Sequence, residues 1–253
     1  MLTWITGDEP LPPAAAAMGP DDEVPGLVAA GGRVTPARLE EAYRQGIFPW
    51  YSPGQPVLWW SPDPRMVLPV SAFRLTRSLR KTLRRFSADP RCQIRVDSAF
   101  EHVIRACADT PRHGQDGTWI VPAMIDAYVA WHRLGRVHSI ETWIDGELVG
   151  GLYGVAIGRM FFGESMFAHA TDASKIALAA LVCLCREHGV PLVDCQQNTA
   201  HLASFGAHEV SRTAFQAHLR TVLAERDIVD WTYDVALWRH LPLQGAASTD
   251  PGT

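Results

Sequence analysis

Residues 149–207 read VGGLYGVAIGRMFFGESMFAHATDASKIALAALVCLCREHGVPLVDCQQNTAHLASFGA. The pattern over 147–157 and 159–166 predicts two successive strands. A helix is expected to begin at Asp172 and to end before Gly189, and because it is apolar nearly all round it should be buried. A short strand follows at 190–195. Strands that flank a buried helix predict an α/β (α+β) fold for this part of the chain.

The sequence on either side of this stretch predicts further elements of the same domain. A strand at 137–144 precedes an Asp-Gly pair at 145–146, which is typical of a hairpin turn. Periodicity and start signals predict further helices at 73–86, 97–107, 121–134, 198–204 and 212–224.

The N-terminal part has a different character. Thr35 followed by Pro36 predicts a capped helix that runs to about Gln45. Residues 46–65 are rich in proline and aromatic side chains, so we expect a rigid aromatic loop that leads into a strand at 66–68. Residues 1–25 are expected to be loop, with a short edge strand at 2–5. These differences predict a small N-terminal domain (1–65), a larger α/β domain (66–240) and a flexible tail (241–253).

Length, composition and net charge exclude few classes of function. The chain has 253 residues, 47% of them apolar, and a net charge of −4, so overall charge indicates no particular partner. The five cysteines form no CxxC pair and no metal-ligand pattern, which favours a reducing compartment over a disulfide scaffold. The N-terminus lacks the pattern of a signal peptide, and no apolar run is long enough to span a bilayer. We therefore expect a cytoplasmic protein without a metal.

One segment is strongly basic. Eight of the 23 lysines and arginines lie between Arg74 and Arg95, with Asp89 as the one acid among them. Leucines recur every fourth residue on one side of the expected helix, and a different face carries Arg77, Arg80, Lys81 and Arg84. Such a stripe favours a phosphate backbone as partner. A solvated surface or contact with a membrane surface are the alternatives.

Three polar residues in apolar surroundings mark a candidate chemical site. They are Glu164, Asp194 and Gln196, which lie in segments with the pattern of strands or turns. A buried acid in such a segment is costly unless it is paired or takes part in the function. Glu164 could instead form an ion pair with Lys175 or Arg159, and Asp194 could cap the helix near residue 198. Asp194 also ends a buried strand, the position from which side chains of α/β sheets reach a ligand crevice.

Seven runs in order carry a resemblance to a known family. They are RQGIFPWYSPGQPVLWWSPDPR (44–65), DGTWI (116–120), HSIETW (138–143), GGLYGVAIG (150–158), FFGESMF (161–167), ASKIAL (173–178) and DCQQNTAHLASFGA (194–207). Together they resemble the leucyl/phenylalanyl-tRNA–protein transferases. The resemblance implies a GNAT-like acyltransferase domain with a small N-terminal domain, acting as a monomer without cofactors. It implies transfer of Leu or Phe, and less well Met, from leucyl-tRNA or phenylalanyl-tRNA to proteins with N-terminal Arg or Lys, which marks them for N-degron degradation.

The resemblance also implies roles for particular residues. The catalytic positions are Asp194, Gln196 and Glu164. The aminoacyl pocket positions are Leu152, Phe162, Leu178, Leu181 and Val193, which plain core packing would also explain. The positions near the 3′ adenosine are Tyr43, Trp50 and Trp119. The basic helix would carry the tRNA backbone on Arg77, Arg80, Lys81 and Arg84.

The chemistry of these side chains suits aminolysis of an ester. An α-amino group has a pKa near 7.7–8.0, so a weak, well-placed proton acceptor suffices. Asp194 can take or orient that proton, directly or through Gln196, and the Gln196 amide can donate to a developing oxyanion. Glu164 can hold the cationic acceptor terminus or its Arg/Lys side chain. Alternatively, the tRNA 2′-hydroxyl shuttles the proton and the protein mainly positions the reactants.

Three rival readings remain at the level of sequence. An acyl-CoA N-acyltransferase would share the element order, but residues 165–175 lack the glycines that cradle a pyrophosphate. A non-catalytic tRNA-binding protein would leave the three polar residues unexplained. Cys195 as a nucleophile with His201 as its base is the third, against which stands the ordinary burial of free cysteine.

Overall fold

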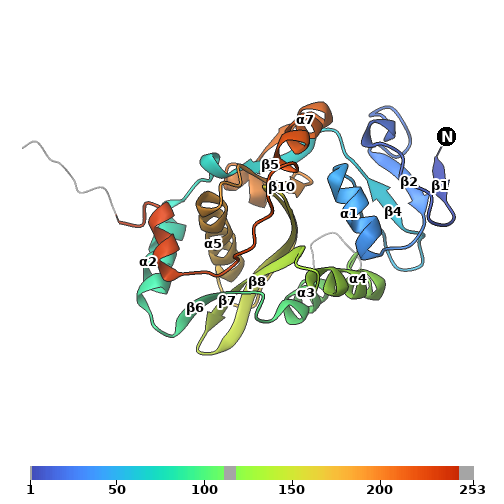
Figure 1. The fold of residues 1–253 in the computed structure, drawn as a ribbon. Coiled ribbons are helices and arrows are strands. Elements are labelled where there is room, and N and C mark those ends of the chain that lie inside the picture. Colours follow the sequence, from blue (N-terminus) through green and yellow to red (C-terminus); the bar gives the residue numbers. More distant parts are fainter. Residues whose placement is uncertain (1, 111–117, 245–253) are drawn as a thin grey trace, which may run out of the picture.

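The computed structural model describes residues 2–110 and 118–244, which form two sheets joined by short connections. The larger sheet has seven strands in the order β11-β5-β10-β9-β8-β7-β6. The smaller sheet has four, in the order β1-β2-β4-β3, and is built from the N-terminal part (Figure 1).

The larger sheet is mixed, and its centre is an antiparallel meander. This meander is β7 (Val137–Ile144), β8 (Glu147–Ile157) and β9 (Met160–Ala168). Helix α5 (Ala173–Glu187) then crosses over to β10 (Leu192–Gln196), which pairs parallel with β9. Antiparallel pairing adds β5 (Arg65–Pro69) and β11 (His208–Val210) at one edge and β6 (Cys92–Val96) at the other.

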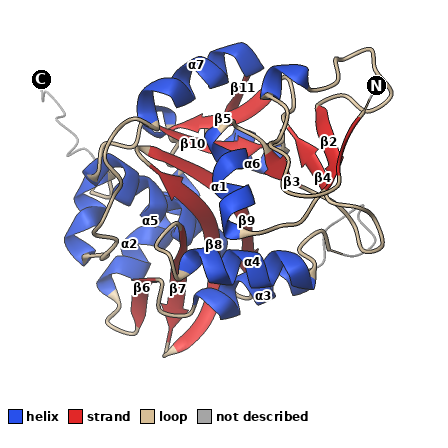
Figure 2. Ribbon diagram, turned by 45° about the vertical axis from the view of Figure 1, so that its right-hand side comes forward, coloured by secondary structure: helices blue, strands red, loops and turns tan. Residues whose placement is uncertain are grey.

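Helices cover both faces of the larger sheet, as Figures 1 and 2 show. One face carries α5, α2 (Arg77–Ala88) and the short helix η3 (Val235–His240). Helix α5 is buried along most of its length, as predicted from the apolar residues on all its sides. The other face carries α3 (Phe100–Asp109) and α4 (Pro122–His132). The chain ends with α6 (Ala200–Ser204) and α7 (Arg212–Val222) around β11, before η3.

The smaller sheet shares a core with α3 and α4. Its strands are β1 (Thr3–Ile5), β2 (Leu27–Gly31), β3 (Phe48–Pro49) and β4 (Leu58–Trp60), with the 3₁₀ turn η1 (Ala14–Ala16). Helix α1 (Pro36–Arg44) begins as the sequence predicts, because the Thr35 hydroxyl accepts from the Arg38 N–H. Another 3₁₀ turn, η2 (Val70–Ala72), follows β5.

Most expected elements are present, and the mixed α/β fold class is confirmed and compatible with a GNAT-like domain. The expectation of a loop without strands over 46–65 is wrong, because β3 and β4 pair there, with the prolines at strand ends and turns. Strands β2, β6 and β11 were not expected. Leu241, placed in the tail from sequence, is buried against the core, and residues 245–253 of that tail lie outside the described residues. Within the described ranges, none of the helices has the length and hydropathy of a membrane span.

Candidate active site

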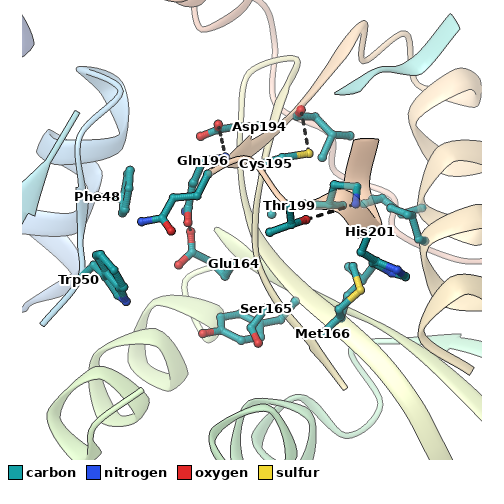
Figure 3. Close-up of a pocket in the computed structure, with 18 of the residues that line it drawn as sticks. Phe48, Trp50, Glu164, Ser165, Met166, Asp194, Cys195, Gln196, Thr199 and His201 are labelled. Atoms are coloured by element: carbon teal, nitrogen blue, oxygen red, sulfur yellow. Dashed lines mark hydrogen bonds between the residues drawn. The ribbon is translucent and has the colours of Figure 1, made fainter. Parts of the chain in front are cut away.

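A cavity of about 510 Å³ opens between the two parts of the molecule. Figure 3 shows Phe48 and Trp50 on one side, Thr199 and His201 on the other, and Glu164 with Gln196 between them. Its apolar wall is formed by side chains from β8, β9, α5 and β10, namely Leu152, Met166, Leu178, Leu181 and Val193. The cavity therefore has one apolar wall, one aromatic wall and a small polar region.

Two irregularities in strand pairing shape the polar region. Strands β9 and β10 pair only at Phe161–Val193 and Phe162–Asp194. Just beyond, the β8–β9 register skips Glu164, and the β10–β5 register skips Cys195. A bulge inserts one residue and redirects the next side chains, and bulges are common next to active sites. Here the two bulges bring Glu164 and Gln196 to the same point of the cavity.

Glu164 is the centre of a hydrogen-bonded cluster. Its Oε1 accepts from the Tyr43 hydroxyl at 2.5 Å and from Gln196 Nε2 at 2.7 Å, and its Oε2 accepts from the Tyr128 hydroxyl at 3.1 Å. The two tyrosine hydroxyls are 2.6 Å apart. Burial raises the pKa of Glu164 to about 8 and outweighs the lowering by the three donors. Burial, and next the charge of Glu164, also raise the pKa of both tyrosines, which keeps them as neutral donors.

Asp194 is engaged in a different way. Its side chain is 0% exposed, and its two oxygens accept from Arg65 Nε at 2.8 Å and Arg65 Nη2 at 2.6 Å. Oδ1 also accepts the Gln196 backbone N–H at 2.9 Å. Both carboxylate oxygens are thus occupied by donors from within the protein. Of the two routes left open by the sequence, the geometry favours action through Gln196 over direct proton transfer to Asp194.

Four of the five expected pocket residues line the cavity, namely Leu152, Leu178, Leu181 and Val193. The placement of Phe162 in the pocket is wrong. Its ring is fully buried and packs edge-on against Tyr43, 5.2 Å between centroids, on the other face of β9. Alternation along the strand sends neighbouring side chains to opposite faces, so Phe162 belongs to the core that supports the site.

Of the three residues expected near the 3′ adenosine, two line the cavity and one does not. Trp50 and Trp119 line the cavity. The placement of Tyr43 as a stacking surface is wrong, because its ring is 0% exposed and lies between Phe162 and Trp131. What Tyr43 presents towards the site is its hydroxyl, bonded to Glu164.

The basic helix is α2, and its leucines face the core as the spacing predicts. Leu79 and Leu83 are buried, while Arg77, Lys81 and Arg84 are exposed and Arg80 is half-buried. Within residues 2–110 and 118–244, none of these four cations forms an ion pair. Thr82 donates to Asp172 at the start of α5 at 3.2 Å, so α2 is tied to the helix that lines the cavity.

Several alternatives from the sequence are now corrected. Lys175 pairs with Asp172 at 2.6 Å rather than with Glu164. Asp194 does not cap α6, whose N-cap is Thr199. Cys195 is unsuited to a nucleophile, because burial raises the pKa of its thiol and Sγ donates to the Val193 carbonyl at 3.8 Å. In the described part of the chain, no group of His, Cys, Asp and Glu has the geometry of a metal site.

Sequence reasoning missed three residues of the site. Arg65 lies inside the quoted 44–65 run and precedes an apolar strand, so a lone arginine entering a buried strand was the available signal. Tyr128 lies in an apolar helix and carried no signal. Met166 lies in the quoted 161–167 run, and the bulge at Glu164, which sequence does not reveal, places it on the cavity side.

Together, the fold and the cavity define an α/β protein whose apolar cavity holds buried titratable groups, as the active sites of enzymes do. Family comparison then names the family. The model described as leucyl/phenylalanyl-tRNA protein transferase matches residues 67–220, and the model of its N-terminal domain matches residues 32–63. The chain belongs to the leucyl/phenylalanyl-tRNA–protein transferase family.

Curated relatives with that name match almost the whole chain. The one from Methylibium petroleiphilum is 64% identical over 244 residues, which cover 96% of this chain and 92% of the relative. The one from Leptothrix cholodnii is 60% identical over 254 residues, covering 99% of each chain. The one from Burkholderia pseudomallei is 57% identical over 249 residues, covering 98% of this chain and 97% of the relative.

Proposed function

We propose that this protein transfers Leu or Phe, and less well Met, from leucyl-tRNA or phenylalanyl-tRNA to the α-amino group of proteins with N-terminal Arg or Lys. The product is marked for N-degron degradation. The observation that carries the proposal is the apolar cavity with the Glu164–Gln196 pair at its wall, in a chain that belongs to this family. We further propose that the enzyme is a cytoplasmic monomer, which light scattering and cell fractionation test.

The cavity walls suit the parts of an aminoacyl-adenosine. The wall formed by Leu152, Leu178, Leu181 and Val193 suits a branched or aromatic apolar side chain. Trp50 and Trp119 offer surfaces on which the 3′ adenine can stack, an interaction worth about 1–3 kcal/mol per base. The unpaired cations of α2 suit the phosphates of the acceptor stem, which are recognised without reading sequence.

The reaction needs no external activation, because the aminoacyl ester already stores the required free energy. The acceptor amine attacks the ester carbonyl, a C–N bond forms, the bond to the ribose oxygen breaks, and the amine proton passes to that oxygen. The Gln196 amide donates through Nε2 to Glu164, and its carbonyl oxygen is the atom suited to accept from the attacking amine. The tRNA 2′-hydroxyl remains an alternative proton shuttle.

Glu164 suits an acceptor that brings positive charge. With its pKa raised to about 8, the free enzyme holds most of this carboxyl protonated at pH 7. A cationic N-terminus or an Arg/Lys side chain nearby stabilises the ionised form, so acceptor binding and loss of this proton are linked. We expect acceptor affinity to rise with pH towards 8 for this reason.

The coenzyme A reading is disfavoured by the turn between β9 and α5. In a pyrophosphate-binding turn, backbone N–H groups point at the ligand. Here the N–H groups of His169 and Ala170 both donate to the Val149 carbonyl, at 2.8 and 3.2 Å. Those donors are used within the protein.

The test is transfer of radiolabelled Leu from leucyl-tRNA to a peptide beginning with Arg, with no ATP, metal or coenzyme A added. A matched peptide beginning with Ala is the control. Label on the Arg peptide alone supports both the reaction and the acceptor preference. Label on neither peptide, with folded protein and measurable tRNA binding, overturns the proposal in favour of a binding protein.

A further inference from the structure

Arg65 is the most deeply buried arginine of the described residues and lies behind the polar region of the cavity. It begins β5, is 1% exposed, and uses its guanidinium on three acceptors. Nε and Nη2 donate to the two oxygens of Asp194 at 2.8 and 2.6 Å, and Nη1 donates to the Gly46 carbonyl at 3.1 Å. Among the described residues that line the cavity Arg65 is not included, so we place it behind the wall rather than in contact with a bound substrate.

The surroundings favour a guanidinium over any other cation. The Arg65 Cζ lies 4.8 Å from the Phe48 ring centroid and 4.7 Å from that of Phe215. A planar guanidinium stacks on such rings and meets a carboxylate through two parallel bonds, whereas the ammonium of lysine does neither. The site is therefore built for the fork of an arginine.

The pair with Asp194 continues directly to Gln196. Asp194 Oδ1 accepts the Gln196 N–H at 2.9 Å, and Gln196 has a left-handed backbone with a φ of 60°. That conformation is unfavourable for a residue other than glycine unless the surroundings hold it. The one described contact that holds the Gln196 backbone from a side chain is this bond to Asp194. From this position the Gln196 side chain reaches Glu164.

We propose that Arg65 is a positioning residue for the transfer reaction, acting through Asp194 to hold Gln196 in its left-handed turn. Without the fork, Asp194 is an unpaired charge in a buried site and loses the two bonds that fix its orientation. This loss weakens its bond to the Gln196 N–H and lets the amide leave its place beside Glu164. This role rests on the proposed function in one respect, that Gln196 acts on the reacting atoms.

Arg65→Lys tests the role, with Arg186→Lys as the matched control. Arg186 is also partly buried, but it donates to the carbonyls of Val70 and His240, away from the cavity. We expect Arg65→Lys to lower kcat for Leu transfer about 10- to 100-fold, as small misplacements do. KM for leucyl-tRNA and for the Arg peptide should stay within about threefold, because the apolar and aromatic walls of the cavity are unchanged. Unchanged kcat in a folded Arg65→Lys protein overturns the proposal.

A second comparison separates positioning from a direct charge effect, and stands even if Arg65→Lys folds poorly. The double variant Arg65→Gln/Asp194→Asn replaces the ion pair by two neutral amides, and the new Asn oxygen can still accept the Gln196 N–H. We expect its kcat to exceed that of Asp194→Asn alone about tenfold. A double variant no better than Asp194→Asn means that the charge of Asp194 acts directly, and sinks the proposal. Failure of the proposed function itself is distinct, because the unmodified enzyme would then transfer no Leu.

Discussion

Replacing Glu164 by Gln should stabilise the protein, and increasingly so as the pH rises. The carboxyl lies among Tyr43, Tyr128 and Gln196, and a neutral amide fits the same bonds. Its oxygen can accept from Tyr43 and Gln196, while its NH₂ donates to the Tyr128 oxygen, since either tyrosine can donate to the other. The substitution therefore removes the charge and keeps a hydrogen bond to each of the three partners.

The magnitude follows from the pKa of Glu164, raised by burial from its ordinary 4.5 to about 8. An acid whose pKa is higher in the folded chain binds its proton more tightly there, so its favourable contribution is complete below pH 4.5 and is lost as the pH rises to 8. Each pH unit in this window removes about 1.4 kcal/mol, or roughly 3 kcal/mol by pH 7. Because the carboxyl keeps partial contact with the cavity, screening by water reduces this to about 2 kcal/mol.

Urea titrations at pH 5, 6, 7 and 8, followed by tryptophan fluorescence, measure this difference. The free energies of unfolding of Glu164→Gln and the unmodified protein should differ by about 0.5 kcal/mol at pH 5 and by about 2 kcal/mol at pH 7. Glu147→Gln, an exposed glutamate in the β7–β8 hairpin, is the control and should show no such divergence. A difference that is constant across the series would refute the assignment of a raised pKa to Glu164. Activity should move the other way, with weaker binding of the Arg peptide.

Three further variants, each with its measurement, test other parts of the structure. Reversing Arg77, Lys81 and Arg84 to Glu should weaken aminoacyl-tRNA binding and reduce the slope of log affinity against log salt concentration by about 2–3. An unchanged slope would mean that this face of α2 is only solvated. The charge-matched control is reversal of the exposed Arg133, Arg220 and Arg226. Cys195→Ser should keep most transfer activity, because burial raises the pKa of the thiol and keeps it protonated, and a dead but folded variant would revive the covalent route. Gly154→Ala should destabilise the fold by about 3 kcal/mol in urea titrations, because its Cβ would lie 2.4 Å from the Phe162 carbonyl oxygen. Gly7→Ala, whose Cβ would come no nearer than 3.5 Å to another atom, should change stability by less than about 0.5 kcal/mol.

Local chemistry was legible in the sequence. Thr35 and Pro36 predicted the start of α1, the Asp-Gly pair predicted the β7–β8 turn, and the leucine spacing in α2 predicted its buried face. These features depend on backbone preferences and on side-chain periodicity within a few residues. The burial of α5 could likewise be predicted, because a helix with apolar residues on all its sides has no polar face to turn to solvent.

The motif runs indicated which residues belong to the site. They did not indicate how those residues are arranged in space. Arg65 and Asp194 are 129 residues apart, and Tyr43 and Glu164 are 121 apart, so no local pattern could pair them. The face of a strand is equally hidden, because one extra residue at Glu164 or Cys195 reverses the alternation that follows. Phe162 and Tyr43 were placed in the cavity from the family resemblance, but both side chains are buried behind it, because packing between distant segments of the chain decides which rings face the cavity.

The sequence thus determined which elements form and which residue types supply the chemistry, since propensity, capping and hydrophobic period act over short distances. The tertiary structure alone decided which of those residues meet. It made Asp194 a partner of Arg65 rather than a free base, and it made Glu164 a carboxyl with a raised pKa. Burial and pairing are properties of the packed chain, and they set the charge state on which the chemistry depends.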